Sequence, residues 1–183
     1  MDSREEKRTS KFLSLVLRHK PEQIGLKLDN AGWASVTELV EKCNAHSISL
    51  DVDKLSEIVD NNDKKRFIFS PDKQKIRANQ GHSLKVDLGL EQKEPPVILY
   101  HGTAIRNIDS IKEKGLLKRD RHHVHLSAQT DVAMQVGSRY GKATVLTVNT
   151  DQMYKDGLLF YQSENGVWLT DHVPPRYIDF KDL

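Results

Sequence analysis

The middle of the chain carries a short segment that can neither form a regular element nor bury much surface. Residues 90–96 hold three charged side chains and end in the consecutive prolines Pro95 and Pro96. Proline fixes φ and lacks a backbone N–H, so a proline pair interrupts helices and sheets. We therefore expect the 183 residues to fold as two small units joined by a linker at 90–96, each with its own core.

The composition is typical of a globular protein with a modest core: 37% of the residues are hydrophobic and 30% are charged. The net charge is only +2, which argues against a surface that binds duplex DNA by charge alone. One cysteine, Cys43, excludes an internal disulfide and a cysteine-based zinc site. No apolar run approaches the ~20 residues of a membrane span. The charged N-terminus has no apolar signal segment behind it, so we expect a cytoplasmic protein without membrane contact.

The N-terminal half predicts three helices followed by a β-hairpin. The second helix begins at Ser35 and Glu38, whose spacing is that of a capping box, and an alternating stretch at 24–28 predicts a short strand. The predicted helices cover 7–19, a segment starting at 35 and 51–62, and the hairpin strands cover 66–69 and 75–78. This order of elements is typical of a winged-helix module.

The C-terminal half is richer in predicted strands. Asn165 and Gly166 are a strong hairpin signal within an aromatic segment whose rings we expect in the core. The predicted strands lie at 97–100, 124–127, 143–148, 158–161 and 167–169, and the predicted helices at 105–115 and 130–141. Taken together, the two halves predict an α+β protein.

Arg18 and His19 form a cationic pair at the end of the first predicted helix. Positive charge at that end stabilises the helix dipole, which is a sufficient reason for both residues. The pair could also bind an anion, because Arg presents a planar fork of donors that matches phosphate and His transfers protons near neutral pH. Arg66, before the hairpin, is likewise either a solvated charge or a contact for nucleic-acid phosphates.

Residues 99–103 predict a strand that ends at His101. Gly102 would let a ligand approach the backbone, and Thr103 adds a hydroxyl. The simpler alternative is that His101 makes its hydrogen bonds within the protein at a strand-to-helix turn. The chain has no G-x-G-x-x-G fingerprint, so a Rossmann dinucleotide site is not expected.

Residues 119–127 combine three histidines and two arginines. We predict no metal site, because neither a Cys nor a nearby Glu completes a ligand set. On an extended chain Arg121, His123 and His125 share one face. This face favours a phosphate or nucleotide site, and a solvated basic loop is the alternative.

Six short motifs together indicate a family. They are LRHKP at 17–21, KRF at 65–67, QGHS at 80–83, LYHGT at 99–103, RHHVHLS at 121–127 and NGVWLT at 165–170. In this order the chain closely resembles the RNA 2′-phosphotransferase (KptA) family from about residue 9 to its end. The resemblance implies a winged-helix-like lobe that binds RNA at 1–89, a linker at 90–96 and an ADP-ribosyltransferase-like lobe that binds NAD at 97–183.

The resemblance also implies the reaction: removal of an internal 2′-phosphate from RNA with NAD as co-substrate and without a metal. The phosphate first displaces nicotinamide and gives ADP-ribosylated RNA. The ribose 2″-hydroxyl then attacks the phosphorus, which releases 2′-OH RNA and ADP-ribose 1″,2″-cyclic phosphate. The family's catalytic set falls on Arg18, His19, Arg66 and Arg121. We expect these residues to bind the phosphate from both lobes, with His19 as acid or base.

By the same resemblance, the NAD site is expected to include His101, Gly102, Thr103, Asn107, Gly115, His125 and Ser127. Many ADP-ribosyltransferases carry a catalytic Glu near the last hairpin. Here its counterpart is Val167 or, with a shifted alignment, Glu164. An ionised phosphate is already a nucleophile, so a general base is dispensable in the first step.

Two other functions are compatible with the sequence. The first is an ADP-ribosyltransferase that modifies terminal phosphates of nucleic acid, or a protein, and stops after the first step. The second is a winged-helix DNA-binding regulator. The third predicted helix disfavours the regulator, because it is strongly acidic where DNA would have to bind. We expect the protein to be a monomer.

Overall fold

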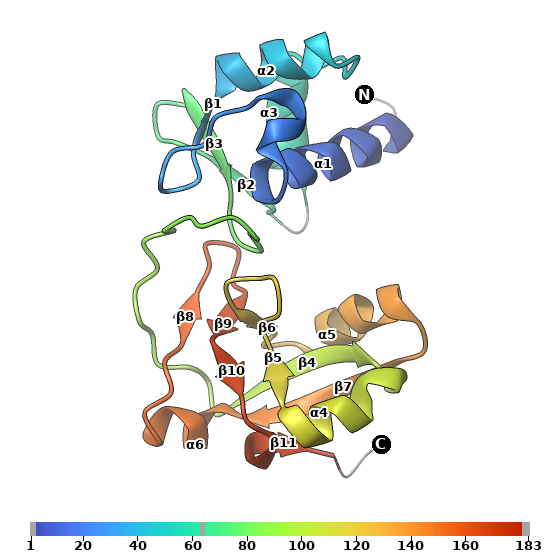
Figure 1. Ribbon diagram of the computed structural model, residues 1–183, viewed down its shortest axis with the longest axis vertical. Helices are drawn as coiled ribbons and strands as arrows, with labels where there is room; N and C mark the ends of the chain where they lie inside the picture. The colour runs from blue at the N-terminus through green and yellow to red at the C-terminus, as the bar shows by residue number, and fades with distance from the viewer. Residues whose placement is uncertain (1–2, 63–64, 181–183) are drawn as a thin grey trace. The chain divides into compact units, whose positions relative to one another are not determined.

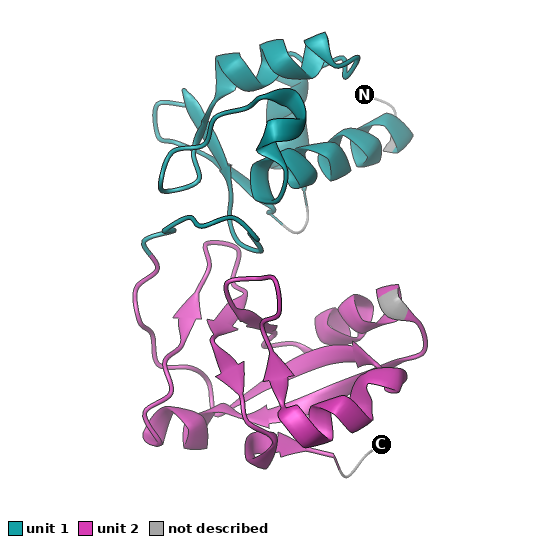
Figure 2. Ribbon diagram, viewed as in Figure 1, with its two compact units in different colours: residues 1–89 teal, residues 90–183 magenta. Residues whose placement is uncertain are grey.

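The computed structural model describes residues 3–62 and 65–180, which form two compact units (Figure 1). Unit 1 is Met1–Gly89 and unit 2 is Leu90–Leu183 (Figure 2). Both units combine helices with small antiparallel sheets, so the predicted α+β class is confirmed. Within the part of the chain that the structure describes, no helix has the length and apolar character needed to cross a membrane.

Unit 1 contains the three predicted helices and the predicted hairpin. Its elements are α1 (Ser3–Arg18), η1 (Pro21–Ile24), β1 (Ala34–Ser35), α2 (Val36–Ala45), α3 (Val52–Asp60), β2 (Phe67–Phe69) and β3 (Lys75–Ala78). The three strands form one antiparallel sheet in the order β1-β3-β2. The core between helices and sheet is formed by buried hydrophobic side chains from every element, including Leu17, Leu39, Leu55 and Ile76.

Local capping explains where α2 and α3 begin. The Ser35 hydroxyl accepts a hydrogen bond from the Glu38 N–H at 3.3 Å, as the capping-box prediction requires. The Glu38 carboxylate, however, pairs with Lys42 at 3.2 Å in the next turn. Asp51 caps α3 by accepting from the Lys54 N–H at 2.8 Å.

The prediction of a strand at 24–28 is wrong. Pro21 starts a one-turn 3₁₀ helix, which closes at Gly25 with a left-handed φ of 63°. Ile24 and Leu26 are nevertheless buried in the unit 1 core. The alternation at 24–28 therefore arises because an irregular segment buries every second side chain, and not because the segment pairs in a sheet.

Unit 2 is built from two three-stranded antiparallel sheets, ordered β11-β7-β4 and β6-β9-β8, and a two-stranded sheet of β10 and β5. Its strands are β4 (Ile98–Ala104), β5 (Leu116–Leu117), β6 (Val124–Leu126), β7 (Ala143–Asn149), β8 (Tyr161–Gln162), β9 (Trp168–Thr170), β10 (His172–Val173) and β11 (Ile178–Asp179). Its helices are η2 (Ile105–Asn107), α4 (Ile108–Lys114), α5 (Thr130–Gly137), η3 (Ser138–Tyr140), α6 (Thr150–Lys155) and η4 (Pro175–Tyr177).

The aromatic hairpin forms as predicted. β8 and β9 pair across a turn that contains Asn165 and Gly166, and Gly166 has a left-handed φ of 79°. Phe160 and Trp168 are buried in the unit 2 core. The segment predicted as a linker packs along this hairpin: Gln92 forms a bridge with Tyr161, and the Lys93 N–H donates to the Phe160 carbonyl at 2.9 Å.

Strand β4 is longer than predicted. It does not end at His101 but continues through Gly102 and Thr103 to Ala104, because β7 pairs with it along all seven residues. Gly102 therefore lies inside a sheet. The predicted strand-to-helix turn begins only at η2.

Helix α5 lies directly on the backbone of β4 (Figure 1). A Cβ at Gly102 would stand 1.6 Å from the Ala133 carbonyl oxygen, and a Cβ at Gly137 would stand 2.8 Å from the Thr103 nitrogen. Neither helix nor strand can retreat without breaking its own packing. The missing side chain of Gly102 therefore makes room for α5. The predicted approach of a ligand to the Gly102 backbone stays a prediction.

This contact predicts a large effect of Gly102→Ala on stability. The added methyl group meets backbone and not a flexible side chain, so we expect the free energy of unfolding to fall by about 3 kcal/mol or more. Urea unfolding followed by circular dichroism measures it. Gly89→Ala is the control, because nothing lies within 4 Å of its Cβ and only the left-handed φ is strained, at a cost of about 1 kcal/mol. Equal losses in the two variants would refute the backbone contact.

Candidate functional site

Arg18 and Arg66 are brought together in unit 1. Arg18 is the last residue of α1, and its Nη2 donates to the Arg66 carbonyl at 3.3 Å. The Arg18 guanidinium also lies over the ring of the buried Phe67, 6.0 Å from its centroid. These contacts fix the Arg18 side chain beside the start of β2.

Two asparagines hold the segment around Arg66. Arg66 Nη1 donates to Asn62 Oδ1 at 3.2 Å. Asn79, which follows β3, donates its N–H to the Arg66 carbonyl at 2.9 Å and its Nδ2 to the Lys65 carbonyl at 2.6 Å. Both asparagines are buried. Their amides therefore orient the Arg66 segment from within the unit.

His19 joins the same group through the loop after β3. Its Nδ1 lies 3.0 Å from the Ser83 hydroxyl, and the Ser83 N–H donates to the Arg18 carbonyl at 3.0 Å. Arg18 and His19, at the end of α1, and Arg66, just before β2, thus come from two segments of unit 1, and we call these three residues the arginine–histidine cluster. All three are partly exposed. Two guanidiniums and an imidazole in this arrangement can bind and protonate a phosphate group.

In unit 2 the structure brings His101 and His125 together. His101 Nδ1 donates to the His125 carbonyl at 3.0 Å. Burial lowers the pKa of His101, the Arg121 charge lowers it further, and the hydrogen bond to His125 opposes both effects. The His101 imidazole is therefore neutral near pH 7.

Arg121 reaches the same place from the loop before β6, where its Nη1 lies 3.5 Å from His125 Nδ1. β6 begins only at Val124, so the predicted extended face of Arg121, His123 and His125 does not form. His123 packs against Tyr161 instead, with ring centroids 5.5 Å apart, and burial lowers its pKa. The exposed guanidinium of Arg121 nevertheless lies near His101 and His125.

The edge of β4 offers main-chain hydrogen-bonding groups. Tyr100 exchanges both of its main-chain hydrogen bonds with Ser127, each at 2.8 Å. Main-chain groups of alternate residues in a strand point to the same side, so the N–H and C=O of Gly102 face the Ser127 side, away from β7. Ser127 then turns toward α5, with its hydroxyl accepting from the Gln129 N–H at 3.1 Å.

The remaining predicted NAD residues have identifiable local roles. Asn107 Nδ2 donates to the Thr103 hydroxyl at 3.1 Å, which joins the end of β4 to η2. Gly115 caps α4 with φ of 73°, and a Cβ there would lie 2.1 Å from the Val173 carbonyl oxygen. Close packing between β5 and β10 thus accounts for this glycine.

The two candidates for the position of a catalytic Glu lie in the β8–β9 turn. Glu164 is exposed at its tip. Val167 is half-buried, and its N–H donates to the Ser163 hydroxyl at 3.1 Å. The assignment of Val167 or Glu164 stays a prediction.

Over residues 3–62 and 65–180, no group of His, Cys, Asp or Glu side chains has the arrangement of a metal site. The polar neighbours of the arginine–histidine cluster were not predicted as site residues. Ser83 lies in the QGHS motif, and Asn62 and Asn79 flank the hairpin. No signal in the sequence marks the two asparagines, because their burial, and with it their need for hydrogen-bond partners, is visible only in the structure.

The two sites define an α+β protein with clustered guanidinium and imidazole groups, the chemistry of a phosphate-handling class of protein. The family model described as "RNA 2'-phosphotransferase, Tpt1 / KptA family" matches residues 4–172. A probable RNA 2′-phosphotransferase of Flavobacterium johnsoniae is 57% identical over 175 residues, 96% of each chain. One of Acaryochloris marina is 55% identical over 171 residues, 93% of this chain and 94% of that one. The chain therefore belongs to the RNA 2′-phosphotransferase, Tpt1/KptA family, and the predicted resemblance is confirmed.

The surroundings of His101 predict its titration. We expect its pKa to lie below the ordinary histidine value, and Arg121→Gln to raise it by removing a nearby positive charge. Proton NMR of the imidazole resonances, assigned with His101→Gln, measures both effects. Arg119→Gln removes a charge that does not contribute to the shift and should leave the pKa unchanged.

The same shift has a consequence for stability. Because the folded-state pKa is below the unfolded one, the unfolded state binds more protons between the two values, and stability falls as the pH drops through that window. An ordinary or raised pKa for His101 would contradict the described environment.

Proposed function

We propose that the protein is an NAD-dependent RNA 2′-phosphotransferase that removes an internal 2′-phosphate from RNA. The observation that carries this proposal is the arginine–histidine cluster, formed by three residues of the family's motifs and braced by Ser83, Asn62 and Asn79. An RNA 2′-phosphotransferase must bind a phosphate monoester, the 2′-phosphate of its substrate. The cluster supplies donors and a proton carrier suited to one.

Arg18, Arg66 and Arg121 would bind the phosphate, which carries nearly two negative charges at pH 7. Each charge-assisted hydrogen bond contributes about 1.5–3 kcal/mol. In the first step a phosphate oxygen bonds to the ribose C1″ of NAD while the bond from that carbon to the nicotinamide nitrogen breaks. No general base is needed for this step, because the phosphate is already ionised.

In the second step the ribose 2″-hydroxyl attacks the phosphorus, and the bond from phosphorus to the RNA 2′-oxygen breaks. The products are 2′-OH RNA and ADP-ribose 1″,2″-cyclic phosphate. Negative charge on the phosphoryl oxygens makes the guanidiniums most important here. Because Ser83 orients the His19 ring through Nδ1, we assign proton transfer to Nε2, either from the attacking hydroxyl or to the departing 2′-oxygen.

Unit 2 would bind NAD. A nicotinamide carboxamide has a C=O acceptor and an NH₂ donor group, which complement the main-chain N–H and C=O of Gly102 at the edge of β4. A neutral His101 beside Thr103 can hydrogen-bond to the nicotinamide ribose without repelling the positively charged ring. Asn107, Gly115 and Ser127 would lie toward the ADP portion, and His125 would connect this site to Arg121.

The element order of each unit supports the corresponding lobe assignment. Unit 1 has the order α1, β1, α2, α3, β2, β3, with the sheet ordered β1-β3-β2, which fits a winged-helix-like lobe. In unit 2 the Tyr100–Ser127 bridge connects the two three-stranded antiparallel sheets, which fits an ADP-ribosyltransferase-like lobe. We further propose that the protein acts as a monomer in the cytoplasm, where Cys43 stays a thiol.

Incubation with NAD and an RNA bearing one internal 2′-phosphate tests the proposal. We expect one nicotinamide released for each 2′-phosphate lost, measured by chromatography and by the mass of the RNA. A stable ADP-ribosylated RNA as the end product would indicate an ADP-ribosyltransferase that stops after the first step. Absence of nicotinamide release with any phosphorylated nucleic acid or protein would exclude both enzymes and favour a regulator.

Loss of a cluster guanidinium should separate the two steps. Arg66→Ala should slow the second step by about 100-fold or more, as removal of a transition-state donor does, and slow the first step less. Rapid-quench kinetics should then show ADP-ribosylated RNA accumulating. Arg139→Ala, which removes an exposed arginine of unit 2, is the control. Equal slowing of both steps would refute this division of roles.

Arg18→Lys tests whether charge alone is sufficient. Lysine keeps the positive charge but cannot reproduce the planar fork, so we expect activity to fall by roughly 10–100-fold, the equivalent of one charge-assisted hydrogen bond. Circular dichroism should show an unchanged fold. Near wild-type activity would mean that Arg18 does not bind phosphate through a fork.

A further inference from the structure

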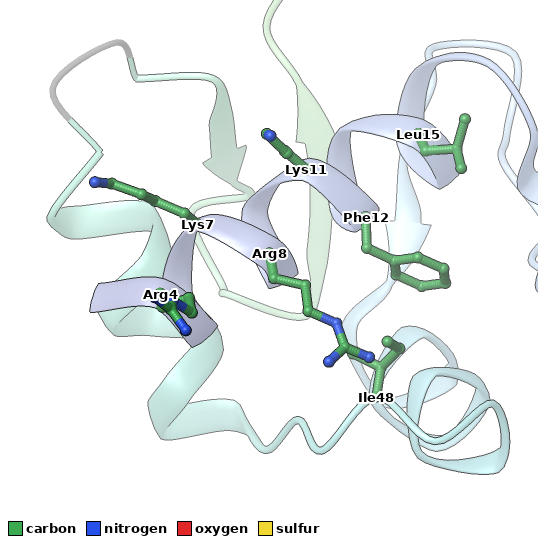
Figure 3. A pocket seen from close by; sticks show the side chains of 7 residues that line it. All are labelled: Arg4, Lys7, Arg8, Lys11, Phe12, Leu15 and Ile48. Atoms are coloured by element: carbon green, nitrogen blue, oxygen red, sulfur yellow. The ribbon is translucent and has the colours of Figure 1, made fainter. Parts of the chain in front are cut away.

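A groove runs along α1, and none of the residues that line it takes part in the proposed chemistry. Its volume is about 850 Å³, and it is lined by Arg4, Lys7, Arg8, Lys11, Phe12, Leu15 and Ile48 (Figure 3). We call it the basic groove. Six of these residues belong to α1, and Ile48 lies in the segment between α2 and α3.

The cations of the basic groove occupy one face of the helix. Residues 4, 7, 8 and 11 follow the spacing of 3.6 residues per turn, and Glu5 and Glu6 fall outside that face. Lys7, Arg8 and Lys11 are exposed, and none of them pairs with a carboxylate of residues 3–62 or 65–180. Their charge is therefore directed to solvent or to a ligand.

The inner surface of the groove is apolar. Phe12, Leu15 and Ile48 are half-buried, and Phe12 and Ile48 also pack against the unit 1 core. Figure 3 shows Arg8 extending from α1 toward Ile48, with Phe12 beside it. A rim of cations around an aromatic side chain is how proteins bind single-stranded nucleic acid, with phosphates on the cations and bases on the rings.

The distribution of charge within unit 1 favours α1 over α3 as a surface for nucleic acid. In α3 the residues Asp53, Glu57 and Asp60 are exposed, and Asp51 caps it. In winged-helix proteins the corresponding helix is the one that contacts nucleic acid, and here its charge repels phosphates. The basic groove has the opposite charge.

We propose that the basic groove binds the sugar–phosphate backbone of the substrate RNA, several nucleotides away from the 2′-phosphate. This inference rests on the proposed function for the identity of the strand as substrate. On α1, Lys7 and Arg18 are separated by about 16 Å at the helical rise of 1.5 Å per residue. That length corresponds to roughly five nucleotides of a stacked strand. A long RNA can therefore reach both the groove and the cluster, whereas a trinucleotide reaches only the cluster.

The test compares K7Q/K11Q with wild-type protein on two substrates: a trinucleotide and an RNA of about 20 nucleotides, each with one internal 2′-phosphate. For the long RNA we expect KM to rise about tenfold with kcat unchanged. The slope of log Kobs against log salt concentration for the same RNA should become shallower by about 1.4, which is the loss of two single-strand phosphate contacts. For the trinucleotide neither kcat nor KM should change.

K27Q/K73Q is the matched control, because it removes two exposed lysines of unit 1 outside the groove. Unchanged RNA affinity and salt slope in K7Q/K11Q would overturn the proposal and leave the groove to another occupant, such as an acidic protein partner. Equal losses on both substrates would also overturn it. If the wild-type protein transfers no phosphate, the proposed function is wrong. The salt dependence of long-RNA binding, compared between K7Q/K11Q and wild type, still shows whether the groove binds nucleic acid.

Discussion

The direct contact between the backbones of α5 and β4 is the constraint on which the site in unit 2 depends. Gly102 and Gly137 have no side chains to separate the helix from the strand, and any Cβ at Gly102 would overlap the Ala133 carbonyl. With α5 in this position, β4 stays paired with β7 through His101 and Thr103 and keeps the main-chain groups of Gly102 at its outer edge. The histidines and the edge of the strand are thus placed by packing and not by a loop.

Unit 1 assembles its cluster by a different route. The Arg66 carbonyl accepts from both Arg18 and Asn79, so one main-chain oxygen connects the end of α1, the start of β2 and the end of β3. The positive charges of the cluster repel one another when no anion is bound. The hydrogen bonds that hold Arg18 and Arg66 offset this repulsion in the folded protein. In the proposed function, a phosphate would therefore gain its hydrogen bonds without having to order the side chains.

Local sequence signals predicted the elements whose ends are set by their own residues. Ser35 and Asp51 start helices, and Gly166 closes a hairpin. The length of β4 could not be predicted, because pairing with β7 determines it. Gly102 was predicted to allow a ligand near its backbone, which stays a prediction, whereas its packing against α5 could be seen only in the fold. The contacts of His101 with His125 and of His19 with Ser83 join residues 24 and 64 positions apart; only the family motifs indicated that these segments act together.

The fate of the phosphorus atom tests the account most directly. An RNA with a single ³²P-labelled internal 2′-phosphate should be incubated with the protein and NAD, and the labelled products separated by chromatography. We expect all of the label lost from the RNA to appear in ADP-ribose 1″,2″-cyclic phosphate, in amounts equal to the nicotinamide released. Label that appears as inorganic phosphate, or that leaves the RNA without NAD, would contradict it.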